Sequence, residues 1–260
     1  MTETQNDREI GMTEKQFNKW FSAALMALML VSIAIATVFN LREPEARTFM
    51  IIVAALGSAM GVAASVLSAN GIIWTFIFSM VDIACCLIVD ADNGIWGDFA
   101  LHIVYLLPMQ IVGLVQWKKR GASGTKSEVK ARRLTGKQRW MVAGATLAGL
   151  VVVYGILLAI KYYTIDPSEI NHTQVFADAA RTTFNIAGQI LLSLAFYEQW
   201  HLWILVNIAS ILLWGSTMLS SAASSYTVVM FIKYCFYLIN SINGLRIWYN
   251  LSRETAAPKA

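Results

Sequence analysis

Eight apolar segments, each long enough to cross a lipid bilayer, constrain this chain more than any other feature of its sequence. They lie at 20–39, 48–69, 72–90, 97–117, 140–161, 182–199, 201–219 and 226–248. A helix needs about 20 residues to span the hydrocarbon core, and a single segment in lipid can satisfy its own backbone only as a helix. The sequence therefore predicts an all-α integral membrane protein with about eight transmembrane helices.

The loop at 118–139 predicts how these helices are oriented. It carries one acid, Glu128, against a run of basic residues: Lys118, Lys119, Arg120, Lys126, Lys130, Arg132, Arg133, Lys137 and Arg139. Basic loops remain in the cytoplasm, and an even number of spans then puts both termini there too. We interpret the loop as a topology signal, although contact with anionic membrane lipids is compatible with the same residues.

The chain also contains signs of an internal repeat. The matching pairs are Asn70/Trp74 with Gln199/Trp203, and Gly113/Trp117 with Gly244/Trp248. They predict two parallel three-helix repeats joined by a linking helix (3+1+3), plus one extra N-terminal helix. The expected organisation is a cytoplasmic tail (1–19), the extra helix (20–40), a first bundle (48–117), the basic cytoplasmic loop (118–139), the linking helix (140–162) and a second bundle (173–250).

Polar side chains in the middle of the spans predict a binding site. By depth these residues are Asp82, Gln110, Gln189, Asn207 and Asn240, while Asn185, Trp203, Trp214 and Tyr237 lie on or beside the same helical faces. Such groups are costly in lipid and therefore face the interior of the bundle. Any single amide is equally well explained by a hydrogen bond between helices. Their common depth favours a substrate site.

Several kinds of function are excluded. The three cysteines, Cys85, Cys86 and Cys235, lie in apolar segments without the spacing of metal ligands. The sequence has no nucleotide-binding, zinc or nucleophile motif, so we expect no cofactor, no metal and no enzymatic activity. Asp82 and His102 lie at different depths and do not form an acid–base pair. The basic residues cluster beside apolar spans, which argues against nucleic-acid binding.

One stretch resembles a known family. Trp200, Trp203 and Asn207 fit the Trp-x-x-Trp-x-x-x-Asn signature of PnuC-type vitamin transporters, and Glu198 and the closing Gly244-x-x-x-Trp248 fit as well. The resemblance covers about 48–250. It implies a SWEET-like fold in the bacterial inner membrane and uptake of nicotinamide riboside, an NAD precursor. It further implies facilitated diffusion, with trapping of the substrate by a cytoplasmic kinase. The roles of Gln189, Trp203 and Asn207 come from the resemblance; the other site residues come from depth and face.

The residue types suit that substrate but leave alternatives open. Indole faces attract a cationic ring, worth about 2 kcal/mol or more when water is excluded. Amides donate to and accept from ribose hydroxyls and a carboxamide. Thiamine is also a cationic aromatic, and riboflavin is the other vitamin to consider. A membrane scaffold without transport activity, or a homo-oligomer, is also compatible with the sequence.

Overall fold

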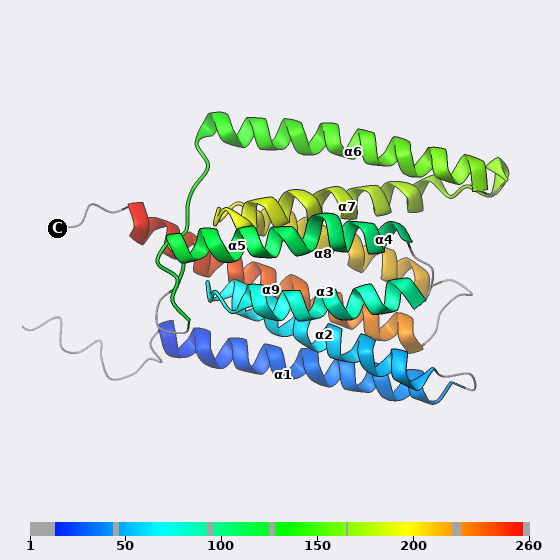
Figure 1. Ribbon diagram of the computed structural model, residues 1–260, viewed down its shortest axis with the longest axis horizontal. Helices are drawn as coiled ribbons and strands as arrows, with labels where there is room; N and C mark the ends of the chain where they lie inside the picture. The colour runs from blue at the N-terminus through cyan, green and yellow to red at the C-terminus, as the bar shows by residue number, and fades with distance from the viewer. Residues whose placement is uncertain are drawn as a thin grey trace, which may run out of the picture.

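The computed structural model describes residues 14–43, 47–92, 96–124, 128–164, 166–219 and 225–256. Long helices dominate them and run side by side (Figure 1). The helices are α1 (Glu14–Leu41), α2 (Thr48–Ala69), α3 (Thr75–Asp92), α4 (Trp96–Leu101), the π-helix η2 (His102–Leu106), α5 (Leu107–Lys119), α6 (Gly136–Thr164), the short 3-10 turn η3 (Pro167–Glu169), α7 (His172–Ser193), α8 (Gln199–Met218) and α9 (Ser225–Ala256). The prediction of an all-α fold is confirmed.

Apolar character follows the same segments. Within the described residues, four helices are long and apolar enough to cross a membrane, at Gln16–Leu41, Thr48–Ala69, Phe99–Lys119 and Gly136–Thr164. A shorter apolar helix covers Gln199–Gly215. α7 contains more polar residues because its inner face, described below, lines a cavity. α6 is apolar on all sides and has no buried residue, as expected of a helix surrounded by lipid.

A π-helical turn separates α4 from α5. Leu107 donates its N–H to the carbonyl of His102, five residues back, rather than to the residue four back. Pro108 follows immediately and has no N–H to donate. The widened turn relieves the crowding that the proline ring would cause in a regular helix. The rod from Trp96 to Lys119 therefore continues across this region without ending.

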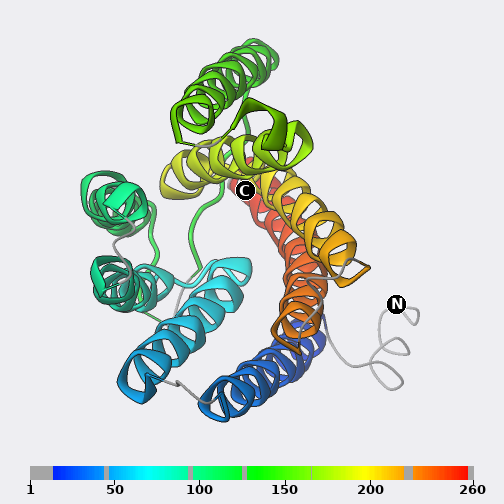
Figure 2. The same cartoon turned by 90° about the vertical axis from the view of Figure 1, so that its right-hand side faces the viewer.

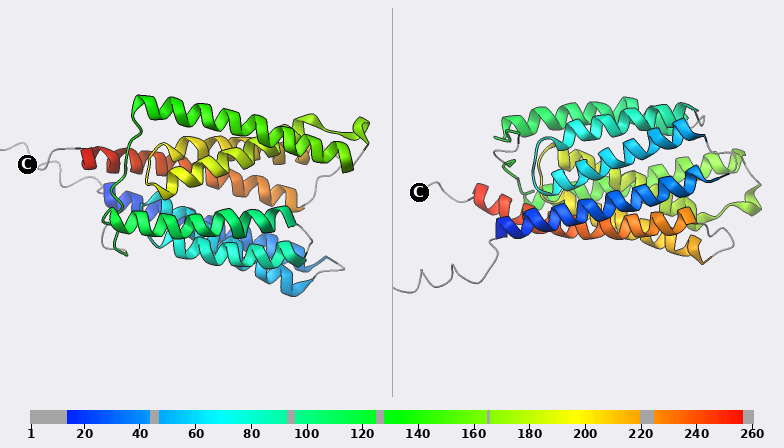
Figure 3. Two further views of the ribbon diagram at one scale, coloured as in Figure 1. Left: turned by 45° about the horizontal axis from the view of Figure 1, so that its top comes forward. Right: turned by 90° about the horizontal axis from the view of Figure 1, so that it is seen from below.

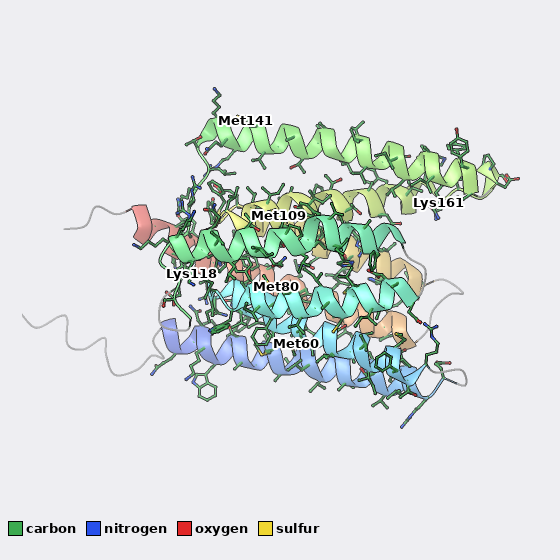
Figure 4. The ribbon with its side chains drawn as sticks, viewed as in Figure 1. Met60, Met80, Met109, Lys118, Met141 and Lys161 are labelled. Atoms are coloured by element: carbon green, nitrogen blue, oxygen red, sulfur yellow. The ribbon has the colours of Figure 1, made fainter. Side chains whose placement is uncertain are left out.

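The successive contacts of α2, α3, α5, α7, α8 and α9 close a ring of helices, which Figure 2 shows from one end. One row consists of α2, α3 and α5, and the other of α7, α8 and α9; the rows meet where α5 packs on α7 and where α2 packs on α9. α6 packs against α7 and lies outside the ring (Figure 2 and the left view of Figure 3). Lys118 and Lys161 mark opposite ends of the helices (Figure 4).

The N-terminal helix α1 bridges the two rows. It packs against both α2 and α9. Met29 is 1% exposed and contributes to a core cluster with Val62 of α2, against which Phe236 of α9 packs. Asn70 donates a hydrogen bond of 2.9 Å to the Ser22 hydroxyl. The additional helix therefore closes one junction of the ring.

The turns after α2 and after α7 have the same construction. Gly71 and Ala195 both have positive φ, at 67° and 60°. In each turn the next residue donates its N–H back to the carbonyl five residues earlier, Ile72 to Leu67 and Phe196 to Leu191, both at 2.9 Å. If Gly71 is aligned with Ala195, Phe76 aligns with Trp200. The internal repeat proposed from the sequence instead paired Trp74 with Trp203.

Two buried tryptophans connect the rows reciprocally at this end. The Trp117 indole of α5 donates to the Leu192 carbonyl of α7 at 2.8 Å. The Trp248 indole of α9 donates to the Ser68 carbonyl of α2 at 2.9 Å. Their rings also contact each other, with centroids 5.3 Å apart. Each row is thus hydrogen-bonded to the penultimate residue of the other row's first helix.

Candidate functional site

A cavity of about 360 Å³ lies inside the ring of helices. Its walls come from α2, α3, α7, α8 and α9, and its lining residues are Gly61, Ala64, Ser65, Ser68, Thr75, Ser79, Asp82, Arg181, Asn185, Gln189, Leu192, Trp200, Trp203, Val206, Asn207, Tyr234, Tyr237 and Ser241. Small-molecule pockets span about 300–1,000 Å³, so this volume suits a compact ligand.

Six of the nine site residues expected from the sequence line this cavity: Asp82, Asn185, Gln189, Trp203, Asn207 and Tyr237. Gln110, Trp214 and Asn240 do not line it. Asn240 is fully buried and donates to the Ser65 hydroxyl at 2.8 Å, so it joins α9 to α2. Gln110 is 3% exposed on α5, which forms no wall of the cavity. Trp214 lies on α8 two turns beyond Asn207, outside the cavity.

The α7 wall presents Arg181, Asn185 and Gln189, which lie four residues apart and therefore share one helical face. Asn185 donates its amide to the Arg181 carbonyl at 2.7 Å. The Gln189 amide nitrogen donates to the Ser193 hydroxyl at 3.2 Å, and Ser193 in turn donates to the Met109 carbonyl. This chain of bonds fixes Gln189 from the side of α5 and α7.

The α8 wall carries two indoles and one amide. The Trp203 indole donates to the Gln199 side chain at 3.4 Å. It packs on Gly188, where an added Cβ would come within 3.2 Å of the ring. Asn207 is 7% exposed and donates to the Ser241 hydroxyl at 2.9 Å. The Trp203 indole and the Asn207 amide of α8 are therefore held in place, the first by packing against α7 and the second by a hydrogen bond to α9.

Trp200 lies near the end of an apolar segment, a position typical of the aromatic belt at the membrane surface, but in the structure it lies inside the protein. It is 3% exposed and lines the cavity. Gly244 makes room for it, since a Cβ there would lie 2.6 Å from the indole. Its buried indole nitrogen has no hydrogen-bond partner in the described part of the chain. An unpaired donor in a cavity wall is suited to a ligand acceptor.

Asp82 provides the carboxylate of the α3 wall. It is seated against α2 at two glycines: a Cβ would come within 2.6 Å of a carboxylate oxygen at Gly61 and within 3.2 Å at Gly57. The small-residue pattern of α2 therefore makes room for this side chain. Lys233 of α9 makes no salt bridge with Asp82 among the described residues; its ammonium lies 5.7 Å from the Tyr237 ring centre.

Several lining residues had no signal in the sequence that separates them from packing residues. Ser65, Ser68, Ser79 and Ser241 are small, and small residues in membrane helices are equally typical of close helix packing. Arg181 was expected at the membrane surface, yet it lines the cavity, and its nearest carboxylate oxygen, on Asp178, is 3.8 Å away. Its spacing of four from Asn185 is the signal that could have revealed it.

The cavity combines one carboxylate, one guanidinium, two indoles, three amides and several hydroxyls. Such a set can hold a flat cationic ring against the indoles and the carboxylate while amides and hydroxyls bind polar substituents. Among the described residues no group of three or more His, Cys, Asp or Glu could hold a metal ion. The groups suit recognition of a ligand.

Comparison with known proteins gives the family. The family model described as "Nicotinamide mononucleotide transporter" matches residues 51–250. The chain belongs to this family. That membership confirms the resemblance found in the signature of α8. A transporter family with apolar helices of this length implies a multi-pass protein of the bacterial inner membrane.

Members of the family include characterised relatives. The nicotinamide riboside transporter PnuC of Neisseria mucosa is 27% identical over 243 residues, covering 92% of this chain and 85% of the relative. PnuC of Haemophilus influenzae is 28% identical over 205 residues, covering 78% and 81%. A crystal structure of the vitamin B3 transporter PnuC aligns with a TM-score of 0.64 and 26% identity over 94% of both chains. The relatives are named as transporters and not as enzymes.

Proposed function

We propose that this protein takes up nicotinamide riboside, and that the cavity inside the ring of helices is its binding site. The observation that carries the proposal is the set of lining groups: the Asp82 carboxylate for the positive ring, the Trp200 and Trp203 indoles for its faces, and amides for ribose and carboxamide. The named function of the PnuC relatives supports it. The nine residues expected from the sequence divide into six proposed ligand contacts and three supporting residues.

The proposal includes the architecture and orientation. The two rows are taken as parallel three-helix repeats, with α6 as the linking helix and α1 as the extra helix. The matching turns at Gly71 and Ala195 and the reciprocal bonds of Trp117 and Trp248 support this repeat. The basic end of the molecule, with both chain ends, is assigned to the cytoplasm. Transport is facilitated diffusion, and phosphorylation by a cytoplasmic kinase retains the riboside in the cell.

Binding titrations of the purified protein with three vitamins test the substrate assignment. Nicotinamide riboside should bind more tightly than thiamine or riboflavin. Riboflavin is neutral and larger, so it would leave Asp82 without a charge to balance. Thiamine is the sharper competitor because it is also cationic. Tighter binding of either competitor would overturn the assignment.

Replacing Asn207 with alanine should weaken nicotinamide riboside binding while leaving the fold intact. The substitution removes an amide from the cavity wall and leaves the Ser241 hydroxyl without its 2.9 Å donor. Loss of a buried hydrogen bond to a ligand costs about 1–3 kcal/mol, or roughly 5- to 150-fold in Kd. Isothermal titration calorimetry measures the change. Asn240→Ala is the comparison, since Asn240 does not line the cavity and acts by bonding Ser65 of α2, so its loss should affect Tm more than affinity. Unchanged affinity in folded Asn207→Ala would remove Asn207 from the site.

Membrane lipids are the second partner we propose. The lysines Lys118, Lys119, Lys130 and Lys137 are exposed. Lys118 borders a hollow of about 520 Å³ whose other walls include Ile73, Trp74, Ile77 and Leu114. An anionic phospholipid fits this combination, with its headgroup at the lysine and its chains along the apolar wall.

Lys118→Gln should therefore weaken binding of phosphatidylglycerol about fivefold, since one lysine near a membrane surface contributes about 1 kcal/mol. Native mass spectrometry of the detergent-solubilised protein reports the lipid-bound fraction. Lys137→Gln is the matched control because Lys137 lies outside the hollow. Equal losses in both variants would indicate general charge attraction and no defined site.

A further inference from the structure

Residues 128–135, which we name the strap, connect the end of α5 to the start of α6 at the basic end of the molecule. Val129 and Ala131 are each 1% exposed, and Leu134 is 7% exposed. A loop that acts only as a topology signal would stay in water. The burial of these three side chains indicates that the strap is part of the packed structure.

The strap is hydrogen-bonded to both of the matching turns. Val129 donates its N–H to the Gly71 carbonyl in the α2–α3 turn at 3.0 Å. Arg132 donates its N–H to the Ala195 carbonyl in the α7–α8 turn at 2.7 Å, and the Arg132 carbonyl accepts the N–H of Tyr197 at 3.0 Å. Gly71 and Ala195 are the two positive-φ residues of the equivalent turns. The strap thus joins the two rows at equivalent points.

The attachment to the second row is much the stronger of the two. The Glu198 carboxylate accepts from the Leu134 N–H at 3.0 Å and pairs with Arg139 at 3.2 Å. The Arg133 guanidinium donates to the Ser252 hydroxyl of α9 at 2.9 Å. The Arg132 guanidinium lies 4.4 Å from the Phe196 ring centre. The attachment to the first row has fewer bonds. Lys130 exchanges hydrogen bonds of 3.2 and 3.3 Å with Arg120 at the end of α5. At the α2–α3 turn, the bond from Val129 to Gly71 is the one backbone hydrogen bond found in the described residues, beside the packing of the Val129 side chain.

The strap also contributes to the floor of the cavity. A single core cluster contains Val129 and Ala131 together with Phe76, Trp117, Trp200 and Trp248, residues of both rows. Trp200 and Leu192 belong to this cluster and also line the cavity. The floor therefore separates the cavity from the basic end of the molecule, and it is continuous across the two rows.

The strap is too short between its two attachment points to remain bound to both rows if the rows separate. Only Ala131 and Lys130 lie between Val129, bound to the first row, and Arg132, bound to the second. Extended chain spans at most about 3.6 Å per residue. Opening the floor by moving one row from the other therefore requires that one attachment break, and the single bond at Gly71 is the weaker.

We propose that the strap is a latch on the cytoplasmic side: it stays with the α7–α8 turn and detaches from Gly71 each time substrate leaves toward the cytoplasm. This inference rests on the proposed transport function. It predicts that fixing the strap to the α2–α3 turn blocks transport and leaves substrate binding unchanged. Fixing the strap to the α7–α8 turn should leave both transport and binding unchanged.

A disulfide between Gly71→Cys and Glu128→Cys fixes the first contact. A Cβ built at Gly71 lies 3.5 Å from the Glu128 Cβ, within the range for a disulfide of about 3.5–4.5 Å. Ala195 shows that this type of turn accommodates a side chain at positive φ. The pair is made in a chain with alanine at Cys85, Cys86 and Cys235. Oxidation should lower uptake of labelled nicotinamide riboside into liposomes at least tenfold, leave Kd within twofold, and be reversed by reductant.

The control pair is Arg132→Cys with Phe196→Cys, which joins the strap to the α7–α8 turn through the one isolated bridge between them. Its oxidation should leave uptake within twofold of the reduced form. Uptake above half the reduced rate in the oxidised Gly71/Glu128 pair would overturn the latch. Loss of binding together with uptake would also overturn it, since the cross-link would then act on the site. If the wild-type protein itself fails to transport nicotinamide riboside, the proposed transport function fails and not the latch alone.

Discussion

Replacing Asp82 with asparagine should weaken binding of nicotinamide riboside at least roughly thirtyfold. Asn keeps the shape of the side chain but removes the charge that faces the cavity. Truncating one partner of a buried charge pair costs about 2–5 kcal/mol, and 2 kcal/mol corresponds to the stated change in Kd. The expected effect exceeds that of any single amide because Asp82 is the one carboxylate among the described lining residues.

A second ligand separates charge from shape. The reduced form of nicotinamide riboside, a dihydropyridine without ring charge, should lose less than about threefold in affinity in Asp82→Asn, since it offers no cation to the carboxylate. Asp90→Asn is the matched control on the same helix: Asp90 pairs with His102 at 2.8 Å and does not line the cavity. Calorimetry measures the Kd of each ligand for the wild-type protein and for both folded variants. Equal losses for both ligands would show that Asp82 supports the cavity without contacting the cation.

Replacing Gly113 with alanine should lower the Tm by several degrees. A Cβ at this position would overlap the ring of Phe76, which is fully buried. The Phe76 ring packs edge-on against Trp117, with ring centroids 4.9 Å apart. Overpacking a tight core costs about 1–3 kcal/mol. The ring has no space to move into, because it lies in the cluster that forms the floor of the cavity. Thermal unfolding in detergent, followed by the exposure of buried tryptophan, measures the loss.

A paired substitution identifies the cause. Gly113→Ala combined with Phe76→Leu should recover part of the lost Tm, since the smaller side chain vacates the overlapping volume. Gly155→Ala is the control: nothing lies within 4 Å of a Cβ there, so helix propensity should raise the Tm slightly. A Tm of Gly113→Ala equal to that of the wild-type protein would contradict the close approach of α3 and α5.

The sequence was sufficient to predict the helices, the carboxylate and the three amides of the cavity wall, for a physical reason. Lipid penalises exposed backbone and buried charge strongly, so apolar length and mid-span amides are direct signals. Gln189 and Asn207 were found in this way and both line the cavity. Asn240 carries the same signal but bonds Ser65, because depth does not tell which neighbour an amide faces.

Other features depend on helix rotation and on contacts between distant segments, which spacing does not encode. Trp200 lies near the end of a span, where aromatic-belt residues are common, and only Gly244 packed against its ring reveals that it points inward. The basic loop has the composition of a solvated segment. Its arginines are nevertheless held by Phe196 and Glu198, residues more than 50 positions away. These partners could be identified only from the folded chain.

Uptake of labelled nicotinamide riboside into liposomes containing the purified protein tests the central claim most directly. The account predicts saturable uptake that needs neither nucleotide nor an ion gradient, is inhibited by unlabelled substrate, and falls strongly in Asp82→Asn with Asp90→Asn unchanged. Flux no higher than in protein-free vesicles, with protein that is folded and correctly inserted, would contradict it.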